Sequence, residues 1–326
     1  MGGRRRGSPA SSRAGSLVLL VALLPGGGAA GASDSIGVIV HCPKPYAALV
    51  SRIEAMGGRV TRIYENVGGL AARIPADALG RLRAEAGVEE VEGDVLVHLP
   101  RQREEHLAVF PFEMDAAKVA GAEELAELGI EPANHSSYLG ALTGAEEVWT
   151  ETGFGAGSLV AVIDSGTHAD HVCLRGRVIA GPDFSTDAGT PFEGSTRVSN
   201  FFHGTFVAGQ VASMCAFEIA EGSGFDAHLP PEAKIPLAPG VFRVPLLGIA
   251  PHSQIYAVTI FPHTGASVPD SIIIAALDHV ITLKRSGALD VDVLNLSLGG
   301  ITLHDGRSLQ ERLVDEATRA GIVVTV

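Results

Sequence analysis

The chain is poor in cysteine, in charged residues and in long apolar runs, and each scarcity argues against a class of protein. Three cysteines without a C-x-x-C pair are too few for a disulfide scaffold and argue against a structural zinc site. Charged residues make up 19% and hydrophobic residues 46%, a balance that disfavours a disordered or coiled-coil protein. The net charge of -13 opposes broad binding to nucleic acid or anionic lipid. The length of 326 residues predicts about two packed domains.

The first 32 residues have the pattern of a secretory signal peptide. Four arginines precede an apolar run at residues 17–24, and the small residues Ala30, Gly31 and Ala32 follow it. The run is far shorter than the ~20 apolar residues of a membrane-spanning helix, although a retained N-terminal anchor is the alternative interpretation. Cleavage after Ala32 would leave 20 basic and 37 acidic residues, a net charge of -17. We therefore expect a secreted protein, extracellular or periplasmic, with no membrane attachment after cleavage.

Residues 33–100 have the alternating pattern of a small α+β domain. The expected elements are a strand at 36–40, a helix at 45–56, strands at 59–64 and 69–74, a helix at 76–86 and a strand at 88–97. Strand, helix, strand, strand, helix, strand is the order of a ferredoxin-like domain. By itself this fold indicates no function, because many unrelated activities use it.

Residues 101–135 are expected to form an acidic, solvated linker. A charge cluster occupies 101–105, and an acidic, alanine-rich helix candidate occupies 113–128. Asn134-His135-Ser136 fits a glycosylation sequon, a short pattern that is frequent by chance.

The remaining part, 136–326, has the pattern of a doubly wound α/β domain with a parallel sheet. Apolar strands are expected at 159–163, 254–260, 291–296 and 322–326. A helix is expected at 271–285, and Ser308 with Glu311 predicts a capping box that opens a helix ending at Gly321. Strands that alternate with helices indicate crossover connections and a sheet covered on both faces.

Two residues of this domain are candidates for catalysis. Asp164 follows an apolar strand, and reactive groups of parallel sheets gather at the carboxyl ends of the strands. The alternative is an ordinary turn, since Asp-Ser-Gly is common in loops. His203 opens a predicted helix of small residues, where the helix N-terminus disfavours the imidazolium form. Taken alone, a histidine beside glycine is more often structural.

Four segments in this order resemble the subtilisin-like serine peptidases. They are DSG at 164–166, HGTFVAG at 203–209, GIAP at 248–251 and LNLSLGG at 294–300. Residues 36–98 resemble the inhibitory propeptide of the same family, so the resemblance covers nearly all of the chain after the signal peptide. It implies the doubly wound subtilisin-like fold, here incomplete, preceded by a ferredoxin-like propeptide. The implied partners are peptide or protein substrates and the chain's own propeptide as an intramolecular inhibitor.

The resemblance also implies a role for each matching residue. Asp164 would hold the imidazole of His203 in the productive tautomer, and His203 would take a proton from a serine hydroxyl. Ser297, Leu298 and Gly299 would pair with an extended peptide substrate by strand addition. The family often binds calcium, but no ligand set is recognisable, so we expect no cofactor from the residues themselves.

The sequence departs from the family in two functional elements. It has no Gly-Thr-Ser segment for the nucleophile, and no asparagine at the oxyanion position, which in the family follows the strand that 322–326 resembles. We therefore expect a serine endopeptidase precursor that stops before its nucleophile and is inactive alone. The alternatives are a decayed or inactive relative, or a non-catalytic peptide-binding or peptidase-inhibitor protein of the same fold.

Other motifs carry weaker hypotheses. His168 and His171 are too few for a closed metal site, and the resemblance gives His171 a structural role, so no metal site is predicted. A glycine-rich stretch at 153–157 precedes its strand, whereas a dinucleotide-binding loop must follow one. Cys173 and Cys215 could form a bridge in an oxidising compartment or remain two buried thiols.

Overall fold

The computed structural model describes residues 34–99, 119–127, 129, 138–185, 202–224, 226–229, 231–262, 267–299 and 306–326. The predicted signal peptide, the sequon at 134–136 and most of the predicted linker lie outside the described residues. Among the residues that are described, no helix combines the length and the apolar character that crossing a bilayer requires.

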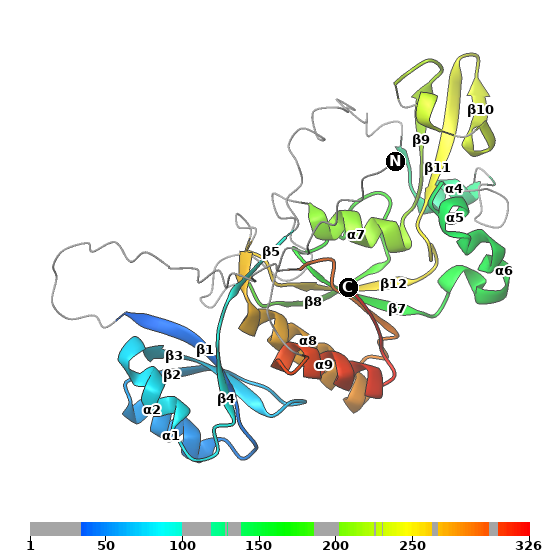
Figure 1. Cartoon of the computed structure of the whole chain (residues 1–326). Helices are drawn as coiled ribbons and strands as arrows, with labels where there is room; N and C mark the ends of the chain where they lie inside the picture. Colours follow the sequence, from blue (N-terminus) through cyan, green and yellow to red (C-terminus); the bar gives the residue numbers. More distant parts are fainter. Residues whose placement is uncertain are drawn as a thin grey trace, which may run out of the picture. The chain divides into compact units, whose positions relative to one another are not determined.

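The N-terminal part of the fold is an antiparallel sheet covered on one face by two helices (Figure 1). Its elements are β1 (Ser35–His41), α1 (Ala47–Ala55), β2 (Arg59–Ile63), β3 (Gly69–Pro75), α2 (Leu79–Arg83) and β4 (Glu90–Gly93). The strand order β2-β3-β1-β4 is that of a ferredoxin-like domain, so the predicted fold is confirmed. Leu49, Ile53 and Leu82 of the helices pack against Val38 and Val40 of β1.

Two predicted elements of this domain differ in the structure. The predicted helix at 76–86 is a 3₁₀ turn, Ala76–Ala78, followed by the short α2. The predicted strand at 88–97 is two strands, because the chain leaves the sheet after β4 and continues as β5 (Leu96–His98) in a separate two-stranded pairing. Strand propensity identified the residues but not the pairing partner of each half.

The C-terminal part is built on a five-stranded parallel sheet in the order β15-β14-β7-β12-β8. The strands are β7 (Leu159–Asp164), β8 (Val178–Asp183), β12 (Gln254–Thr259), β14 (Val293–Asn295) and β15 (Val323–Thr325). Helix α7 (His203–Ala212) covers one face, while α8 (Asp270–Ser286) and α9 (Leu309–Arg319) cover the other (Figure 1). Every residue of β7 is buried, because alternate side chains enter the two opposite layers.

The predicted helix boundaries agree closely with the structure in this sheet domain. Helix α8 extends the predicted 271–285 by one residue at each end. Ser308 and Glu311 form the predicted capping box of α9, and Gly321 follows that helix with a positive φ of 84°. The helix boundaries could be predicted because each amphipathic stretch is flanked by residues that begin or end a helix.

A second, antiparallel sheet was not predicted. Its strands, β6 (Val119–Ala120), β9 (Met214–Ala220), β10 (Ile235–Ala238) and β11 (Val241–Leu247), lie in the order β10-β11-β9-β6. The chain between β7 and β12 therefore contains more than a crossover helix, because β9 and β11 pair directly with each other over seven residues. Their alternating side chains bury Phe217, Ile219 and Val244 in a small core of their own.

The described part of the predicted linker is packed rather than solvated. Helix α4 (Ala122–Glu127) lies within the predicted helix at 113–128, and its Leu125 is fully buried against Trp149 and Met214. The prediction of a solvated linker is therefore wrong for α4.

The C-terminal part also contains several short elements. They are α5 (Tyr138–Thr143), α6 (Trp149–Thr152) and 3₁₀ turns at Ala145–Glu147, Gly153–Gly155, Asp226–His228 and Pro231–Ala233.

Two of the three cysteines form a disulfide bond, and the third is a free thiol. Cys173 and Cys215 form a disulfide that joins the loop after β7 to the antiparallel sheet. Cys42 is a buried thiol, and its burial, with a smaller contribution from the negative charge of Glu89, raises its pKa to about 11. The bridge decides between the two alternatives that the sequence left open.

Candidate active site

Asp164 and His203 meet at the carboxyl edge of the parallel sheet. Asp164 is the last residue of β7, and His203 is the first residue of α7. The Nδ1 atom of His203 lies 2.9 Å from each carboxylate oxygen of Asp164. Asp164 is fully buried, and its Oδ1 accepts a hydrogen bond from the backbone N–H of Ser165 at 2.6 Å. The two residues that the sequence identified 39 positions apart therefore form one ion pair.

Small residues bring α7 close enough to β7 for this contact. A Cβ atom on Gly204 would lie 2.2 Å from the carbonyl oxygen of Gly166. The backbone N–H of Gly204 donates to Ser165 Oγ at 3.0 Å, and the backbone N–H of His168 donates to Thr205 Oγ1 at 2.9 Å. These bonds fix the first turn of α7 on the loop that follows β7.

The environment of His203 suits a proton acceptor held by a carboxylate. Its hydrogen bond to Asp164 raises the pKa of the imidazole, and partial burial opposes that shift. With Nδ1 directed at Asp164, the other nitrogen, Nε2, has no hydrogen-bond partner among the described residues. The pair can therefore accept a proton at Nε2 and stabilise the resulting imidazolium through Asp164.

Gly204→Ala is expected to destabilise the fold by about 3 kcal/mol, because its methyl group overlaps the Gly166 carbonyl. The matched control is Gly209→Ala in the same helix, where a Cβ meets nothing within 4 Å. In that variant, alanine lowers the backbone entropy of the unfolded chain, which should stabilise the fold by up to about 1 kcal/mol. Chemical denaturation of both variants measures the two effects. Equal unfolding free energies of the two variants would show that the fold tolerates a Cβ atom at Gly204.

The predicted substrate segment follows β14 and contacts another part of the chain. Gly299 forms an antiparallel bridge with His98, and β5 pairs antiparallel with β13 (Ser267–Pro269). Residues 96–98 thus pair with β13 over three residues and with the predicted substrate segment at the single bridge between His98 and Gly299. Val97 and Leu99 are buried in the same cluster as Val268 and Leu298. The sequence predicted a pairing edge at Ser297, Leu298 and Gly299, but it gave no signal that β5 would occupy that edge.

Asn295 has a structural position near this segment. Its Nδ2 donates to Ser297 Oγ at 2.9 Å, and its Oδ1 accepts from Thr325 Oγ1 at 2.9 Å. The side chain therefore joins β14 to β15 and to Ser297 of the predicted substrate segment.

Helix α8 holds the ferredoxin-like domain through two carboxylate contacts that the sequence did not predict. The carboxylate of Asp278 accepts the backbone N–H groups of Glu65 at 2.7 Å and of Asn66 at 2.6 Å. At the start of the same helix, Asp94 accepts from the backbone N–H of Ser271 at 2.9 Å and from its hydroxyl at 2.7 Å. These bonds join segments about 180 to 210 residues apart, beyond the reach of local sequence patterns.

The weaker sequence hypotheses have ordinary structural explanations. The rings of His168 and His171 lie 6.0 Å apart, and His171 Nδ1 accepts the backbone N–H of Cys173 at 3.3 Å. Gly153–Gly155 is a 3₁₀ turn that precedes β7. Within the described ranges, the one group of three ligating side chains is His41, Glu90 and Glu92. A histidine nitrogen is a poor calcium ligand, so this group does not fit the calcium that the resemblance suggested.

Known proteins with similar sequences and folds are peptidases. A sequence profile described as the subtilase family matches residues 155–326. Subtilisin E of Bacillus subtilis (strain 168) is 26% identical over 272 residues, which are 83% of this chain and 52% of that protein. Subtilisin of Bacillus pumilus is 30% identical over 170 residues, 52% of this chain and 46% of the relative. This chain thus spans about half the length of the curated relatives it matches.

The fold likeness extends over the ferredoxin-like domain as well. The crystal structure of fervidolysin from Fervidobacterium pennivorans, a keratinolytic enzyme related to subtilisin, has a TM-score of 0.52. It is 20% identical, and the match covers 92% of this chain and 40% of fervidolysin. At this identity the likeness shows the fold alone.

Proposed function

Because the chain belongs to the subtilase family of serine peptidases, we propose that it comprises the signal peptide, the inhibitory propeptide and the first part of the catalytic domain of a secreted endopeptidase. The observation that carries this proposal is the Asp164–His203 ion pair at the carboxyl edge of the sheet. In the proposed reaction Asp164 holds Nδ1 of His203, and Nε2 takes the proton of a serine hydroxyl as that oxygen attacks the peptide carbonyl. His203 then returns the proton to the leaving amine.

The nucleophile and the oxyanion asparagine belong to segments that have no counterpart in these 326 residues. We infer that the 326-residue chain alone does not hydrolyse peptides. Its share of the machinery is the proton acceptor, the carboxylate that orients it, and the pairing edge at Ser297, Leu298 and Gly299.

The proposed propeptide is the ferredoxin-like domain. The pairing of β5 with β13 and with Gly299 supports this role, because a substrate peptide would pair with the same edges by strand addition. Asp278 and Asp94 add charge-assisted and polar contacts that hold the domain on α8. Peptidase activity would then require cleavage beyond His98 and release of β5.

Secretion is proposed from the signal-peptide pattern at residues 1–32. The Cys173–Cys215 disulfide supports the same proposal, because such bridges persist in oxidising compartments and are rare in the cytosol.

The test compares the 326-residue chain with a longer gene product that contains a downstream Gly-Thr-Ser segment. We expect the longer product to cleave a chromogenic peptide and to react with a serine-directed fluorophosphonate, and the 326-residue chain to do neither. Hydrolysis by the 326-residue chain would contradict the proposed division of the triad. A gene that encodes no such segment would favour the second candidate function.

That second candidate is a non-catalytic protein that binds peptides or inhibits peptidases. The paired state of β5 favours it, since a strand already seated on the pairing edge is an inhibitor-like contact. Inhibition of a separate subtilisin-like peptidase by the 326-residue chain, without any hydrolysis, would support it.

Asp278→Ala is expected to weaken attachment of the ferredoxin-like domain by about 3 kcal/mol, or roughly 100-fold, because two backbone N–H groups lose a charged acceptor. Hydrogen exchange of residues 59–75 in the full chain measures this loosening. Asp290→Ala is the matched control, since Asp290 is an exposed partner of Lys284 and such pairs contribute little. Similar exchange in both variants would refute the attachment role of Asp278.

A further inference from the structure

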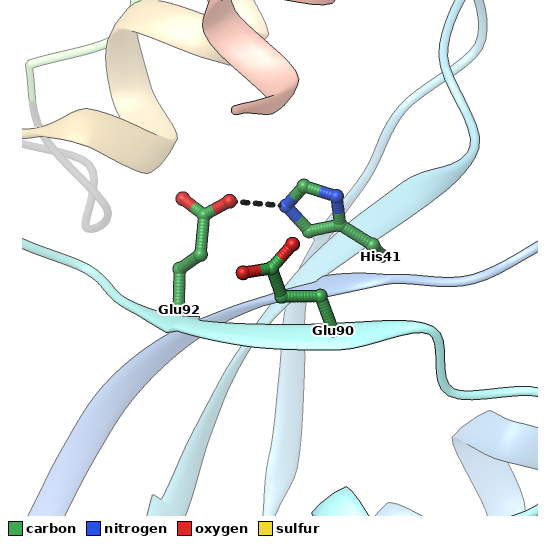
Figure 2. Close-up of side chains that lie close together, drawn as sticks. All are labelled: His41, Glu90 and Glu92. Atoms are coloured by element: carbon green, nitrogen blue, oxygen red, sulfur yellow. Dashed lines mark ion pairs between the residues drawn. The ribbon is translucent and has the colours of Figure 1, made fainter. Parts of the chain in front are cut away.

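Three metal-ligating side chains converge on the sheet of the ferredoxin-like domain, away from Asp164 and His203. They are His41 at the end of β1 and Glu90 and Glu92 on β4 (Figure 2). One ligand atom from each residue lies within 4.8 Å of those of the other two. The Nε2 atom of His41 lies 2.5 Å from a carboxylate oxygen of Glu92.

The register of the sheet explains why these three side chains share a face. His41 lies opposite Glu90, and Ile39 lies opposite Glu92, in the antiparallel pairing of β1 with β4. Directly opposed residues of an antiparallel pair project from the same face, as do residues two apart on one strand. Ile39 packs in the cluster that contains the side chains of α8 and α9, so the three ligands lie on that face. Cys42 packs in the opposite cluster with α1 and is not a fourth ligand.

His41 is the observation that distinguishes this group from a common cluster of surface carboxylates. Its side chain is 4% exposed, and Nε2 is buried without a hydrogen-bond partner. The nearby oxygen of Glu92 is within ion-pair distance but does not complete a hydrogen bond. Coordination of a metal by the lone pair of Nε2 would give this buried nitrogen a directional bond that its contact with Glu92 does not provide.

We propose that His41, Glu90 and Glu92 bind one divalent transition-metal ion of the zinc class. One neutral imidazole and two carboxylates supply three ligands, and their charge matches that of a divalent cation. Ligand atoms of a tetrahedral zinc ion are about 3.4 Å apart. The ligand atoms of these three side chains lie within 4.8 Å of one another, so small side-chain rotations would bring them to that spacing. Glu90 is exposed, which leaves an open side for metal entry and for a water ligand. Calcium and magnesium are disfavoured because they prefer oxygen ligands throughout.

The ion would join β1 to β4 on the face that meets α8 and α9. Gly69 of β3 lies opposite His41, and a Cβ atom on Gly69 would lie 2.3 Å from a side-chain carbon of Leu309 at the start of α9, so this part of the sheet borders the catalytic domain. If the ferredoxin-like domain is the inhibitory propeptide, the ion would also stabilise the inhibited form. That consequence rests on the proposed function, whereas metal binding itself does not.

The test is calorimetric titration of the chelator-treated 326-residue chain with Zn²⁺ at micromolar protein concentration. We expect one equivalent to bind and to raise the thermal midpoint. Glu90→Gln should weaken binding at least tenfold, because an exposed ligand is lost without disturbing the core. Glu89→Gln is the matched control: it removes the same charge from the adjacent exposed residue, which lies towards Cys42. It should bind as the wild type does.

Further variants separate this site from others in the chain. His41→Asn should abolish binding, with circular dichroism to check that the variant folds. Substituted Co²⁺ should give visible absorption bands that Glu90→Gln weakens and Glu89→Gln retains. The proposal is overturned if Zn²⁺ binds only at millimolar concentration, if Glu90→Gln and Glu89→Gln bind alike, or if His168→Asn rather than Glu90→Gln removes binding. Because none of these measurements uses peptidase activity, failure of the metal site is distinguishable from failure of the proposed function.

Discussion

His203→Ala is expected to lower kcat for peptide hydrolysis by about 10⁶-fold in a gene product that contains the nucleophile, the size of effect known for the corresponding loss in subtilisin itself. The physical reason is the loss of the proposed proton acceptor, which Asp164 holds at the sheet edge. Asp164→Asn should cost about 10⁴-fold, because the amide favours the wrong imidazole tautomer. Hydrolysis of a chromogenic peptide, normalised to folded protein, measures both.

The control for this pair is His252→Ala, which removes a histidine that contacts Phe154 rather than Asp164. Its activity should remain within a factor of a few of the wild type. Retention of activity by His203→Ala to within tenfold would remove His203 from the reaction, whatever the family resemblance.

In the proposed reaction, the same pair sets the pH dependence of the rate. Since Asp164 raises the pKa of His203 above its usual value of 6.5, the imidazole is protonated and inactive at low pH. kcat/KM should therefore rise with pH through a midpoint above 6.5, and in Asp164→Asn the midpoint of the residual activity should move to lower pH. The free energy of unfolding depends on pH in the opposite direction from the activity. The Asp164–His203 interaction stabilises the fold fully below pH 6.5 and is lost as pH rises through the raised pKa. If Asp164→Asn does not move the midpoint of this rise in kcat/KM, then a group other than His203 is responsible for it.

The second large effect concerns the disulfide. Replacing Cys173 and Cys215 together with alanine should lower the free energy of unfolding by about 4 kcal/mol, because the bridge closes a loop with a sequence separation of 42 residues. For a domain of this size that loss corresponds to a fall of about 10 °C in the thermal midpoint. Both positions are buried, so alanine avoids placing a hydroxyl in the core. Differential scanning calorimetry gives the measurement.

Reductant provides the internal control for the disulfide. It should destabilise the wild type by a similar amount and leave the double alanine variant unchanged. Thiol titration of the denatured, unreduced wild type should find one thiol, Cys42, which the native fold protects by burial. Three thiols before reduction would contradict the bridge.

Local sequence patterns were sufficient where one short segment determines its own structure. The apolar run that ends at Asp164, the small residues after His203 and the capping box at Ser308 each contain their own start or stop signal. These motifs predicted the parallel sheet and both members of the ion pair. They did not predict β9 or β11, which form a separate antiparallel sheet by pairing with each other.

By itself, the sequence thus determined the family and the ferredoxin-like order of elements, and it singled out Asp164 and His203 as candidates for catalysis. The tertiary structure alone decided that Cys173 bonds Cys215, that β5 pairs with β13 and bridges to Gly299, and that the carboxylate of Asp278 accepts the backbone N–H of Glu65. It also brought His41 to Glu90 and Glu92. The physical reason is common to all four: each contact depends on strand register or on packing between segments far apart in the chain. Such contacts leave no periodic signal within either segment.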